Sequence, residues 1–357
     1  MKGIVFMGER KVELMDFPDP EPSPRDVVLE IKASGMCGTD LGPYRRKYKP
    51  GQTTSGVSRV DGHVIGGHEP CGVVAAVGTA VSEQEAKVGD RVMDHHYDGC
   101  GTCRHCQSGW SQMCLDGAVV FGSGSHGAHA KYMSVPAHTL VPLPDDISFE
   151  AGAAISCGTG TAYGALKRLG LEGDETIVVF GQGPVGLSGT QLAAAMGARV
   201  IAVDISAERR EMALSRGADV VIDPSADDPV QAIKDLTHGE GADKALDATS
   251  SADARRNAVR STRAWGTACL VGIGGDVQLE VLPDLIHRQI TLVGHWTFSK
   301  VGQADCARFV SDRKIDVDSL FTHKWKLEDA EEAYQLFDQQ KTGKGVFLPA
   351  KGPTEKD

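Results

Sequence analysis

The chain has 357 residues, of which 41% are hydrophobic and 24% charged, as in a globular protein with room for two domains. Its 37 Lys and Arg against 48 Asp and Glu give a net charge of −11, which argues against a large nucleic-acid-binding surface. No apolar run approaches the roughly 18 residues of a membrane span, and the N-terminus MKGIVFMGER lacks the apolar core of a signal peptide. We therefore expect a cytoplasmic protein with neither nucleic-acid nor membrane partners.

The first ~150 residues predict an irregular β domain. Apolar runs at 27–34, 72–78 and 128–135 are separated by Gly and Pro every dozen residues or so, a pattern typical of short strands and turns.

This predicted β domain contains a dense cysteine cluster in the stretch DGCGTCRHCQSGWSQMC. Disulfides, redox chemistry and metal binding are the possible reasons for it. Cytosolic thiols are kept reduced, so clustered cysteines there more often bind metal. The C-x-x-C-x-x-C-x7-C spacing could supply four thiolates to a closed tetrahedral zinc site; an iron–sulfur cluster is the competing metal. The candidate ligands are Cys100, Cys103, Cys106 and Cys114.

Three further candidate ligands are dispersed along the chain between glycines. Cys37 lies in GMCGTD, His68 in GGHEP and Cys157 in ISCGTGTAYGAL. Taken singly, a buried Cys is usually a small hydrophobic residue and a lone His a core residue. Together they match a recognised Cys-His-Cys shell of catalytic zinc, in which the fourth position stays open.

From about Leu166 the pattern changes to strands that alternate with helices. TIVVF (176–180) predicts a buried strand, 184–198 a helix, 199–204 a strand, and 206–217 a helix between a Ser N-cap and a Gly. More strands are predicted at 218–223, 244–249, 267–273 and 290–295. This alternation indicates a doubly wound parallel sheet. After His295 the chain is expected to return to the first domain, with an amphipathic helix near 327–339.

A glycine loop follows the strand TIVVF and precedes a helix. Gly181, Gly183 and Gly186 form G-x-G-x-x-G, which lets the backbone approach a pyrophosphate at the helix N-terminus. Asp204 ends the next strand, 18 residues after the last glycine. Its carboxylate could bind an adenosine ribose and would repel the 2′-phosphate of NADP. The pattern favours NAD, although Arg209 nearby argues the other way.

These motifs together resemble the zinc-dependent medium-chain alcohol dehydrogenases over nearly the whole chain. The resemblance implies an α/β protein with an irregular β-rich, GroES-like catalytic domain and a doubly wound Rossmann domain, with the active-site zinc in the cleft between them. The implied boundaries are 1–156 for the first part of the catalytic domain, 157–295 for the NAD-binding domain and 296–357 for the return segment. The cysteine quartet then becomes a structural zinc lobe at 94–116.

The resemblance also implies roles at the active site. Cys37, His68 and Cys157 would hold the catalytic zinc, on which the alcohol oxygen loses its proton before hydride passes to the nicotinamide. Thr39 would carry that proton, Asp40 would orient His68, and Glu69, next to His68 in the Gly67–Glu69 motif, would be an exchangeable ligand. The cofactor would contact Thr161, the loop residues Gly181, Gly183, Pro184, Val185 and Gly186, and the segment Val271, Gly272 and Ile273.

Two positions depart from the family pattern. Gly42 stands where many relatives carry a proton-relay His, so water or another His, such as His63, would complete the relay. Ser156 stands where polyol and sugar dehydrogenases commonly place a Glu or Asp, which favours an alcohol dehydrogenase. The alternatives are a polyol, sugar-acid or sugar-phosphate dehydrogenase of the same superfamily and a zinc-free, non-catalytic relative. Relatives are dimers or tetramers, so a homodimer or homotetramer is expected.

A basic run within 43–51 is unexpected in an acidic chain. It contains Arg45, Arg46, Lys47 and Lys49, and the resemblance places it near the substrate entrance. Because Arg binds carboxylate and phosphate well, Arg45 and Arg46 are candidates for binding an anionic substrate. A solvated loop or a subunit contact is the alternative.

Overall fold

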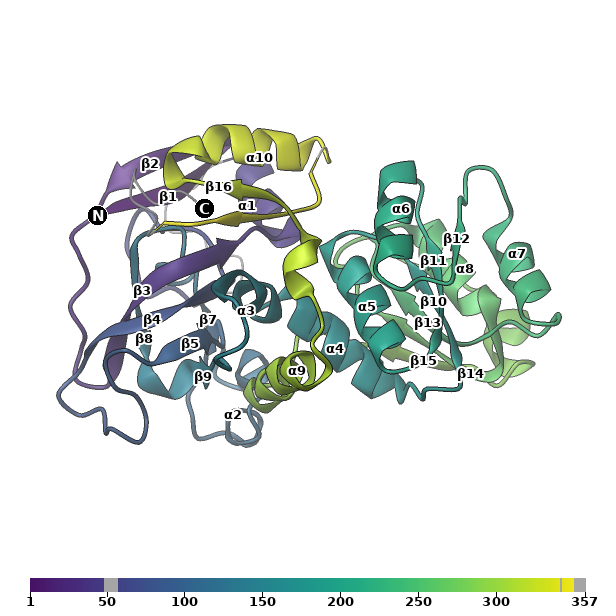
Figure 1. Cartoon of the computed structure of the whole chain (residues 1–357), viewed down its shortest axis with the longest axis horizontal. Coiled ribbons are helices and arrows are strands. Elements are labelled where there is room, and N and C mark those ends of the chain that lie inside the picture. The colour runs from purple at the N-terminus through teal and green to yellow at the C-terminus, as the bar shows by residue number, and fades with distance from the viewer. Residues whose placement is uncertain (48–56, 341, 350–357) are drawn as a thin grey trace. The chain divides into compact units, whose positions relative to one another are not determined.

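The computed structural model describes residues 1–47, 57–340 and 342–349. It divides into two compact units (Figure 1): unit 1 comprises Met1–Cys157 and Phe298–Asp357, and unit 2 comprises Gly158–Thr297. The chain thus leaves unit 1 after Cys157 and returns to it at Phe298, one and two residues beyond the boundaries expected from the sequence.

Unit 1 is built on a seven-stranded sheet in the order β16-β17-β3-β4-β5-β9, with β8 also paired to β3. The strands are β3 (Asp26–Gly35), β4 (Pro70–Val77), β5 (Arg91–Asp94), β8 (Tyr132–Pro136), β9 (Leu140–Pro142), β16 (Phe321–Trp325) and β17 (Lys344–Phe347). The last two come from the return segment, so β17 joins the sheet beside β3. The strand expected at 128–135 is shorter than predicted, because it begins only at Tyr132.

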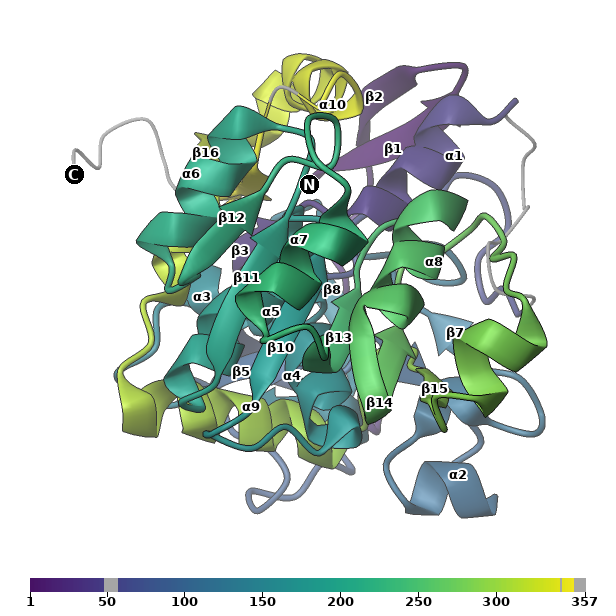
Figure 2. The same ribbon diagram turned by 90° about the vertical axis from the view of Figure 1, so that its right-hand side faces the viewer.

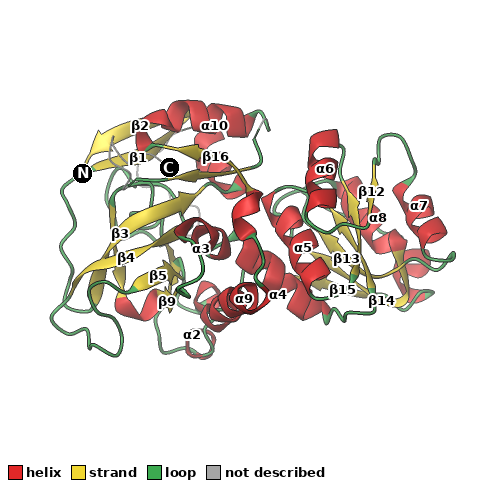
Figure 3. Ribbon diagram, in the orientation of Figure 1, coloured by secondary structure: helices red, strands yellow, loops and turns green. Residues whose placement is uncertain are grey.

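Smaller elements complete unit 1 (Figure 3). A hairpin of β1 (Lys2–Gly8) and β2 (Lys11–Asp16) turns through Glu9 and Arg10 at positive φ, and β6 (Tyr97–Asp98) pairs with β7 (Val119–Val120). The α-helices are α1 (Leu41–Arg45), α2 (Arg104–Gln107), α3 (Phe149–Ile155), α9 (Lys300–Arg313) and α10 (Ala330–Asp338). Short 3-10 helices are η1 (Gly38–Asp40), η2 (Ser111–Met113), η3 (Ala137–Thr139), η5 (Val317–Leu320) and η6 (Leu327–Asp329).

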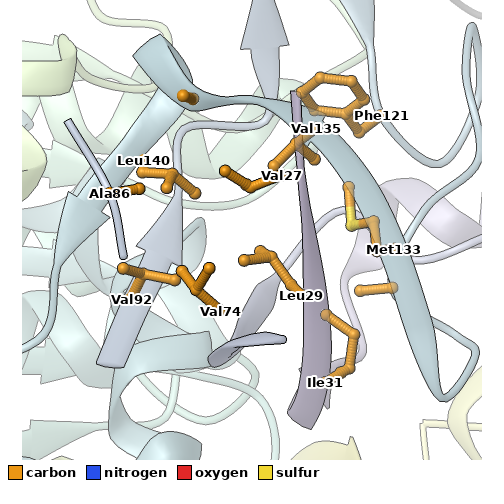
Figure 4. Close-up of a cluster of buried hydrophobic side chains, with 12 residues drawn as sticks. Val27, Leu29, Ile31, Val74, Ala86, Val92, Phe121, Met133, Val135 and Leu140 are labelled. Carbon is orange, nitrogen blue, oxygen red and sulfur yellow. The ribbon is translucent and has the colours of Figure 1, made fainter. Parts of the chain in front are cut away.

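Among the described residues of unit 1, two buried clusters form much of the core. In the first, alternate residues of β3 point to one face of the sheet, so that Val27, Leu29 and Ile31 pack with side chains of β4, β5, β8 and β9 (Figure 4). The second lies between the β1–β2 hairpin, β17 and α10, and its members include Phe6, Met36, Tyr44, Tyr334 and Phe347. Because Met36 precedes Cys37, this second cluster also anchors a candidate metal ligand.

Unit 2 is a six-stranded, entirely parallel sheet. Figure 2 shows its strands in the spatial order β12-β11-β10-β13-β14-β15. They are β10 (Thr176–Phe180), β11 (Arg199–Val203), β12 (Val220–Ile222), β13 (Ala242–Asp247), β14 (Thr262–Leu270) and β15 (Thr291–Gly294). Counted from β10, the order is 3-2-1-4-5-6, that of dinucleotide-binding sheets, in which the ligand binds at the carboxyl ends of the strands where the order reverses.

Helices cover both faces of this sheet. They are α4 (Gly158–Leu169), α5 (Pro184–Ala195), α6 (Ala207–Ser215), α7 (Pro229–Leu236), α8 (Ala252–Ser261) and the π-helical turn η4 (Val281–Ile286). The α6 helix begins as expected, because the Ser206 hydroxyl accepts the Arg209 backbone N–H at 3.3 Å. The predicted fold class is confirmed. Among the described residues, no helix has the length and apolar character needed to cross a membrane.

Candidate metal centres and cofactor loop

The cysteine quartet converges in the structure. The sulfurs of Cys100, Cys103, Cys106 and Cys114 all lie within 4.8 Å of one another. The backbone N–H of Cys103 donates to the Cys100 sulfur and that of Cys100 to the Cys114 sulfur, both at 3.3 Å. The N–H groups of Cys106 and Leu115 lower the pKa of Cys103 to about 6, whereas burial raises the pKa of Cys106 to about 12. A bound cation would favour all four thiolates, so the donor set fits a metal.

A second cluster brings together Cys37, His68, Glu69 and Cys157, whose ligand atoms also lie within 4.8 Å of one another. Cys37 follows β3, His68 and Glu69 precede β4, and Cys157 is the last residue of unit 1 before α4. The structure therefore unites side chains that are far apart in the sequence, at one end of neighbouring strands.

The spacing within this cluster matches a tetrahedral zinc site. The Cys37 and Cys157 sulfurs are 3.8 Å apart, and the Cys157 sulfur lies 3.5 Å from His68 Nε2. Zn–S bonds of about 2.3 Å and Zn–N bonds of about 2.0–2.1 Å in a tetrahedron require about 3.8 Å between sulfurs and about 3.6 Å between sulfur and nitrogen. The hydrogen bond from Cys157 and the charge of His68 also hold the pKa of Cys37 well below its usual value. Both distances thus fit zinc bound by these three residues.

The Asp40 carboxylate contacts two of the candidate ligands on the side away from their ligating atoms. Its Oδ1 lies 3.1 Å from His68 Nδ1, and its Oδ2 accepts the Cys37 backbone N–H at 2.9 Å. One buried carboxylate therefore contacts two candidate ligands and leaves His68 Nε2 facing the sulfurs. Ligating histidines commonly have such a partner, which fixes the ring orientation and the tautomer.

Thr39 lies at the open side of the cluster. Its hydroxyl oxygen is 3.3 Å from the Cys37 sulfur and 3.3 Å from His68 Nε2, and the residue is exposed. At Gly42, a Cβ atom would meet no other atom within 4 Å, so space rather than packing surrounds the expected relay position. His63 is exposed.

Glu69 has a partner that the sequence did not reveal. Its Oε2 accepts from Lys344 Nζ at 2.5 Å, and both side chains are buried. Its Oε1 has no hydrogen-bond partner among the described residues. Burial raises the pKa of Glu69 to about 8, against the opposing charge of Lys344. Because 275 residues separate the pair, no local pattern could have predicted it.

His96 is a second residue that the sequence reasoning missed. Its buried ring packs 5.1 Å from that of His68, centroid to centroid. Its Nδ1 lies 2.9 Å from the carbonyl oxygen of Ser156, and burial lowers its pKa well below the usual value, so the ring is neutral. The Ser156 hydroxyl oxygen lies 2.9 Å from the carbonyl oxygen of Pro70 and 3.0 Å from that of Gly152, and donates its one proton to this pair.

The glycine loop adopts the geometry that a pyrophosphate site needs. Gly181 has φ of +84°, and a Cβ on Gly186 would lie 1.7 Å from the Gly181 oxygen, whereas one on Gly183 would meet nothing within 4 Å. Pro184 and Val185 then open helix α5, whose N-terminus attracts anions. The first and third glycines are required by the turn and by packing, and the second leaves open space for a ligand.

Asp204 has a structural contact in addition to its expected role. Its Oδ2 accepts the Gln182 N–H at 2.6 Å, and its Oδ1 accepts the Ser206 N–H at 2.8 Å. It thereby ties the glycine loop to the end of β11. Arg210, rather than Arg209, contacts Asp204, because its guanidinium donates to the Asp204 carbonyl oxygen at 2.8 Å.

A buried arginine supports the segment 271–273. Arg255 donates to the carbonyl oxygens of Gly272 at 2.7 Å and Asp276 at 3.2 Å, and its Nε lies 3.4 Å from Asp247 Oδ2. Gly272 packs so closely that a Cβ would lie 1.3 Å from the Thr249 oxygen. Ile273 is exposed, while Thr161 lies buried in α4.

Up to Arg45, the basic run belongs to the short helix α1 and is not a loop. Arg45 pairs with Asp338 of α10 at 2.5 Å, as does Arg10 at 2.8 Å. Arg46 Nε donates to the Gly42 oxygen at 3.1 Å. Lys47 lies in an isolated bridge with Gly8, and Lys49 lies outside the described residues. The contacts give both arginines partners within the chain.

A GroES-like β unit that carries two candidate metal centres, joined to a Rossmann sheet with a glycine loop, defines the class of zinc-dependent dehydrogenases. Comparison with known families agrees. Residues 23–145 match the alcohol dehydrogenase GroES-like domain, and residues 184–312 match the zinc-binding dehydrogenase family. The chain belongs to this zinc-dependent medium-chain dehydrogenase family.

Individual relatives are similar over nearly their whole length. An uncharacterized zinc-type alcohol dehydrogenase-like protein, YphC of Escherichia coli, is 37% identical over 353 residues, 97% of this chain and 98% of YphC. L-threonine 3-dehydrogenase of Pyrococcus horikoshii is 32% identical over 345 residues, 94% of each chain. The solved structure of an NAD-dependent alcohol dehydrogenase has a TM-score of 0.86 and 27% identity, and covers 98% of this chain and 100% of its own.

The family prediction is therefore confirmed, and with it oxidoreductase activity and the cofactor pair of zinc and a nicotinamide nucleotide. Relatives with named substrates, such as L-threonine 3-dehydrogenase, act on small molecules.

Proposed function

We propose that the protein is an NAD-dependent zinc alcohol dehydrogenase that oxidises an alcohol to the corresponding ketone or aldehyde, or reduces it back. The observation that carries the proposal is the spacing of Cys157 to Cys37 and to His68, which matches two edges of a zinc tetrahedron, while Asp40 contacts the imidazole. A zinc ion bound by these three residues would supply Lewis-acid chemistry, lowering the pKa of an alcohol oxygen toward neutrality.

The chain's own residues would handle the proton. The Thr39 hydroxyl, next to Cys37 and His68, would hydrogen-bond the substrate oxygen, accept its proton and pass one to solvent through the open space at Gly42. Lys344 keeps Glu69 beside the ligands, with one oxygen unpartnered, so Glu69 is available as an exchangeable ligand. Cys100, Cys103, Cys106 and Cys114 would hold a structural zinc that closes the lobe.

In this proposal unit 2 binds NAD. The glycine loop and the α5 N-terminus would hold the pyrophosphate, Asp204 the adenosine ribose, and Thr161, Val185 and the 271–273 segment the nicotinamide. Unit 1 is then the catalytic domain. Because Asp204 is a carboxylate at the end of β11 and Arg209 makes no contact with it in the described hydrogen bonds, NAD is favoured over NADP.

The alternative polyol-type ligand set is disfavoured, because Ser156 stands at the position of the acidic ligand and its hydroxyl is hydrogen-bonded to the backbone. An anionic substrate bound by Arg45 and Arg46 stays the weaker proposal, because Arg45 already pairs with Asp338.

We further propose a homodimer or homotetramer. The edge strand β15 and the π-helical turn η4 that precedes it expose four large apolar side chains, those of Val281, Leu282, Ile286 and Leu292. This exposure favours their burial against a second copy. The cysteines of the two proposed metal centres form no disulfides, which suits the reducing cytoplasm that we also propose.

Metal analysis joined to a substrate screen tests the proposal. The purified chain should contain about two zinc ions and reduce NAD with at least one alcohol of a broad panel, followed by NADH absorbance. His68→Ala should keep the zinc of the lobe, lose the other and lose turnover. A chain that carries only one zinc, or that is equally active with His68→Ala, would contradict the assignment.

A further inference from the structure

A buried chain of hydrogen bonds runs from Asp40 away from the candidate metal centre into the core of unit 1. The Tyr334 hydroxyl of α10 donates to Asp40 Oδ2 at 3.2 Å and lies 2.6 Å from His129 Nε2. His129 Nδ1 lies 2.7 Å from the Ser34 hydroxyl. Ser34, His129 and Tyr334 are fully buried, and Asp40 nearly so.

Proton counting gives this chain a single direction. A carboxylate only accepts hydrogen bonds, so Tyr334 must donate its one proton to Asp40. The Tyr334 oxygen then accepts from His129 Nε2–H. Burial lowers the pKa of His129 to about 4, so its ring is neutral, and Nδ1 accepts from the Ser34 hydroxyl. In this arrangement each proton of the chain is donated once, and the other Asp40 oxygen, 3.1 Å from His68 Nδ1, accepts from Nδ1–H and leaves Nε2 directed at the sulfur of Cys157.

His129 also supports the backbone beside His68. Gly67 has φ of +87°, and a Cβ there would lie 2.4 Å from His129 Nδ1. The backbone N–H of His129 donates to the Gly66 carbonyl oxygen at 3.0 Å, and the backbone N–H of Ala128 donates to the Gly67 carbonyl oxygen at 2.9 Å. The imidazole therefore fills the space that Gly67 leaves, one residue from the proposed metal ligand.

We infer that Tyr334 and His129 are positioning residues that fix the orientation and tautomer of His68 through Asp40. The inference rests on the proposed zinc site at Cys37, His68 and Cys157. It assigns a task to α10, an element of the return segment that contributes none of the proposed ligands. Losing one partner behind a ligating histidine typically weakens metal affinity 10- to 100-fold. Because Tyr334 acts through Asp40, removing its hydroxyl should lower zinc affinity about tenfold, at the lower end of this range.

Tyr334→Phe tests the inference by removing only the hydroxyl. Chelator competition should show zinc held about tenfold more weakly at the His68 site, and unchanged in the cysteine lobe. When Co²⁺ replaces zinc at that site, the visible absorption of Tyr334→Phe should also differ from that of the Co²⁺-loaded wild type. The matched control is Tyr44→Phe, because Tyr44 packs 5.7 Å from the Tyr334 ring in the same buried cluster but has no part in the chain. It should leave zinc affinity and spectrum unchanged.

A second pair of variants covers the case in which Tyr334→Phe does not fold. His129→Leu removes the donor to Tyr334, whereas His129→Gln can retain it, so zinc affinity should fall in the first and recover at least in part in the second. Folded Tyr334→Phe or His129→Leu protein with zinc affinity within twofold of the wild type would overturn the inference. A wild type that binds no zinc outside the lobe would instead overturn the proposed function.

Discussion

At the scale of single residues, the structure shows that side chains near the two centres do more than their motifs indicate. Asp204 was expected to meet a ribose, yet both its oxygens already accept backbone N–H groups of the glycine loop and the α6 cap. Glu69 was expected beside zinc, yet it is paired with a lysine of the last strand. Each of these residues therefore combines a structural role with its proposed chemical one.

The double role of Asp204 separates two substitutions. Asp204→Asn keeps an acceptor for the Gln182 N–H but removes the charge, so it should lower kcat/KM with NAD and raise it with NADP, shifting the ratio by tenfold or more. Asp204→Ala should weaken both cofactors, because the loop also loses its support. Steady-state kinetics with each nucleotide measure this. A wild type that already prefers NADP would contradict the prediction.

Asp94, at the end of β5, is a buried acid whose pKa burial raises to about 7 from 3.8, partly offset by the Thr139 hydroxyl and Lys300. Between these two values the folded state binds a proton that the unfolded state has released, so stability should fall as pH rises from about 4 to about 7. Asp94→Asn cannot ionise, and its stability relative to the wild type should be greater at pH 8 than at pH 5.

Unfolding curves at the two pH values measure this effect. Asp90→Asn is the control, because the Lys87 backbone lowers the pKa of Asp90 and its proton is already lost in both states at pH 5. If Asp94→Asn and Asp90→Asn show the same pH dependence, the buried charge of Asp94 is not the cause.

At the scale of elements, the sequence predicted those whose stabilising contacts are local or uniform. Parallel strands buried on both faces are continuous apolar runs, so β10 and β11 were visible, and Ser206 marked the start of α6. The β1–β2 hairpin and α1 were missed. The strand β8 was predicted to begin too early, because its limits depend on pairing with β3, which is distant in the chain. The same reason hid Lys344, Tyr334 and His129, whereas the cysteine and glycine motifs were visible because their spacing is itself local.

Arg255 of helix α8 donates hydrogen bonds to the loop that follows β14, and its substitution tests whether this support matters for cofactor binding. Arg255→Lys keeps the charge beside Asp247 but lacks the fork needed to reach both Gly272 and Asp276. We expect NADH affinity to fall about tenfold, as judged by fluorescence titration, with the KM for the alcohol little changed. Arg256→Lys, on the same helix and paired only with Asp253 among its described contacts, should behave as the wild type. Equal affinities in the two variants would refute a role for Arg255.

At the scale of the whole molecule, unit 2 has its own sheet and its own buried cluster. Residues 158–297 expressed alone should therefore unfold cooperatively and bind NADH, detectable by fluorescence. The same fragment with Gly186→Val should not bind, since the added side chain would collide with the Gly181 oxygen. A folded wild-type fragment without affinity for NADH would show that the cofactor requires unit 1.

The position of Cys157 also has an evolutionary consequence. It is the last residue of unit 1, so every proposed zinc ligand lies outside the inserted segment 158–297. A recombination event that replaced this segment with that of another dehydrogenase would exchange the nucleotide preference as a cassette and leave both metal centres encoded by the host sequence. Chimaeras cut directly after Cys157 and before Phe298 should thus inherit cofactor choice from one parent and metal loading from the other.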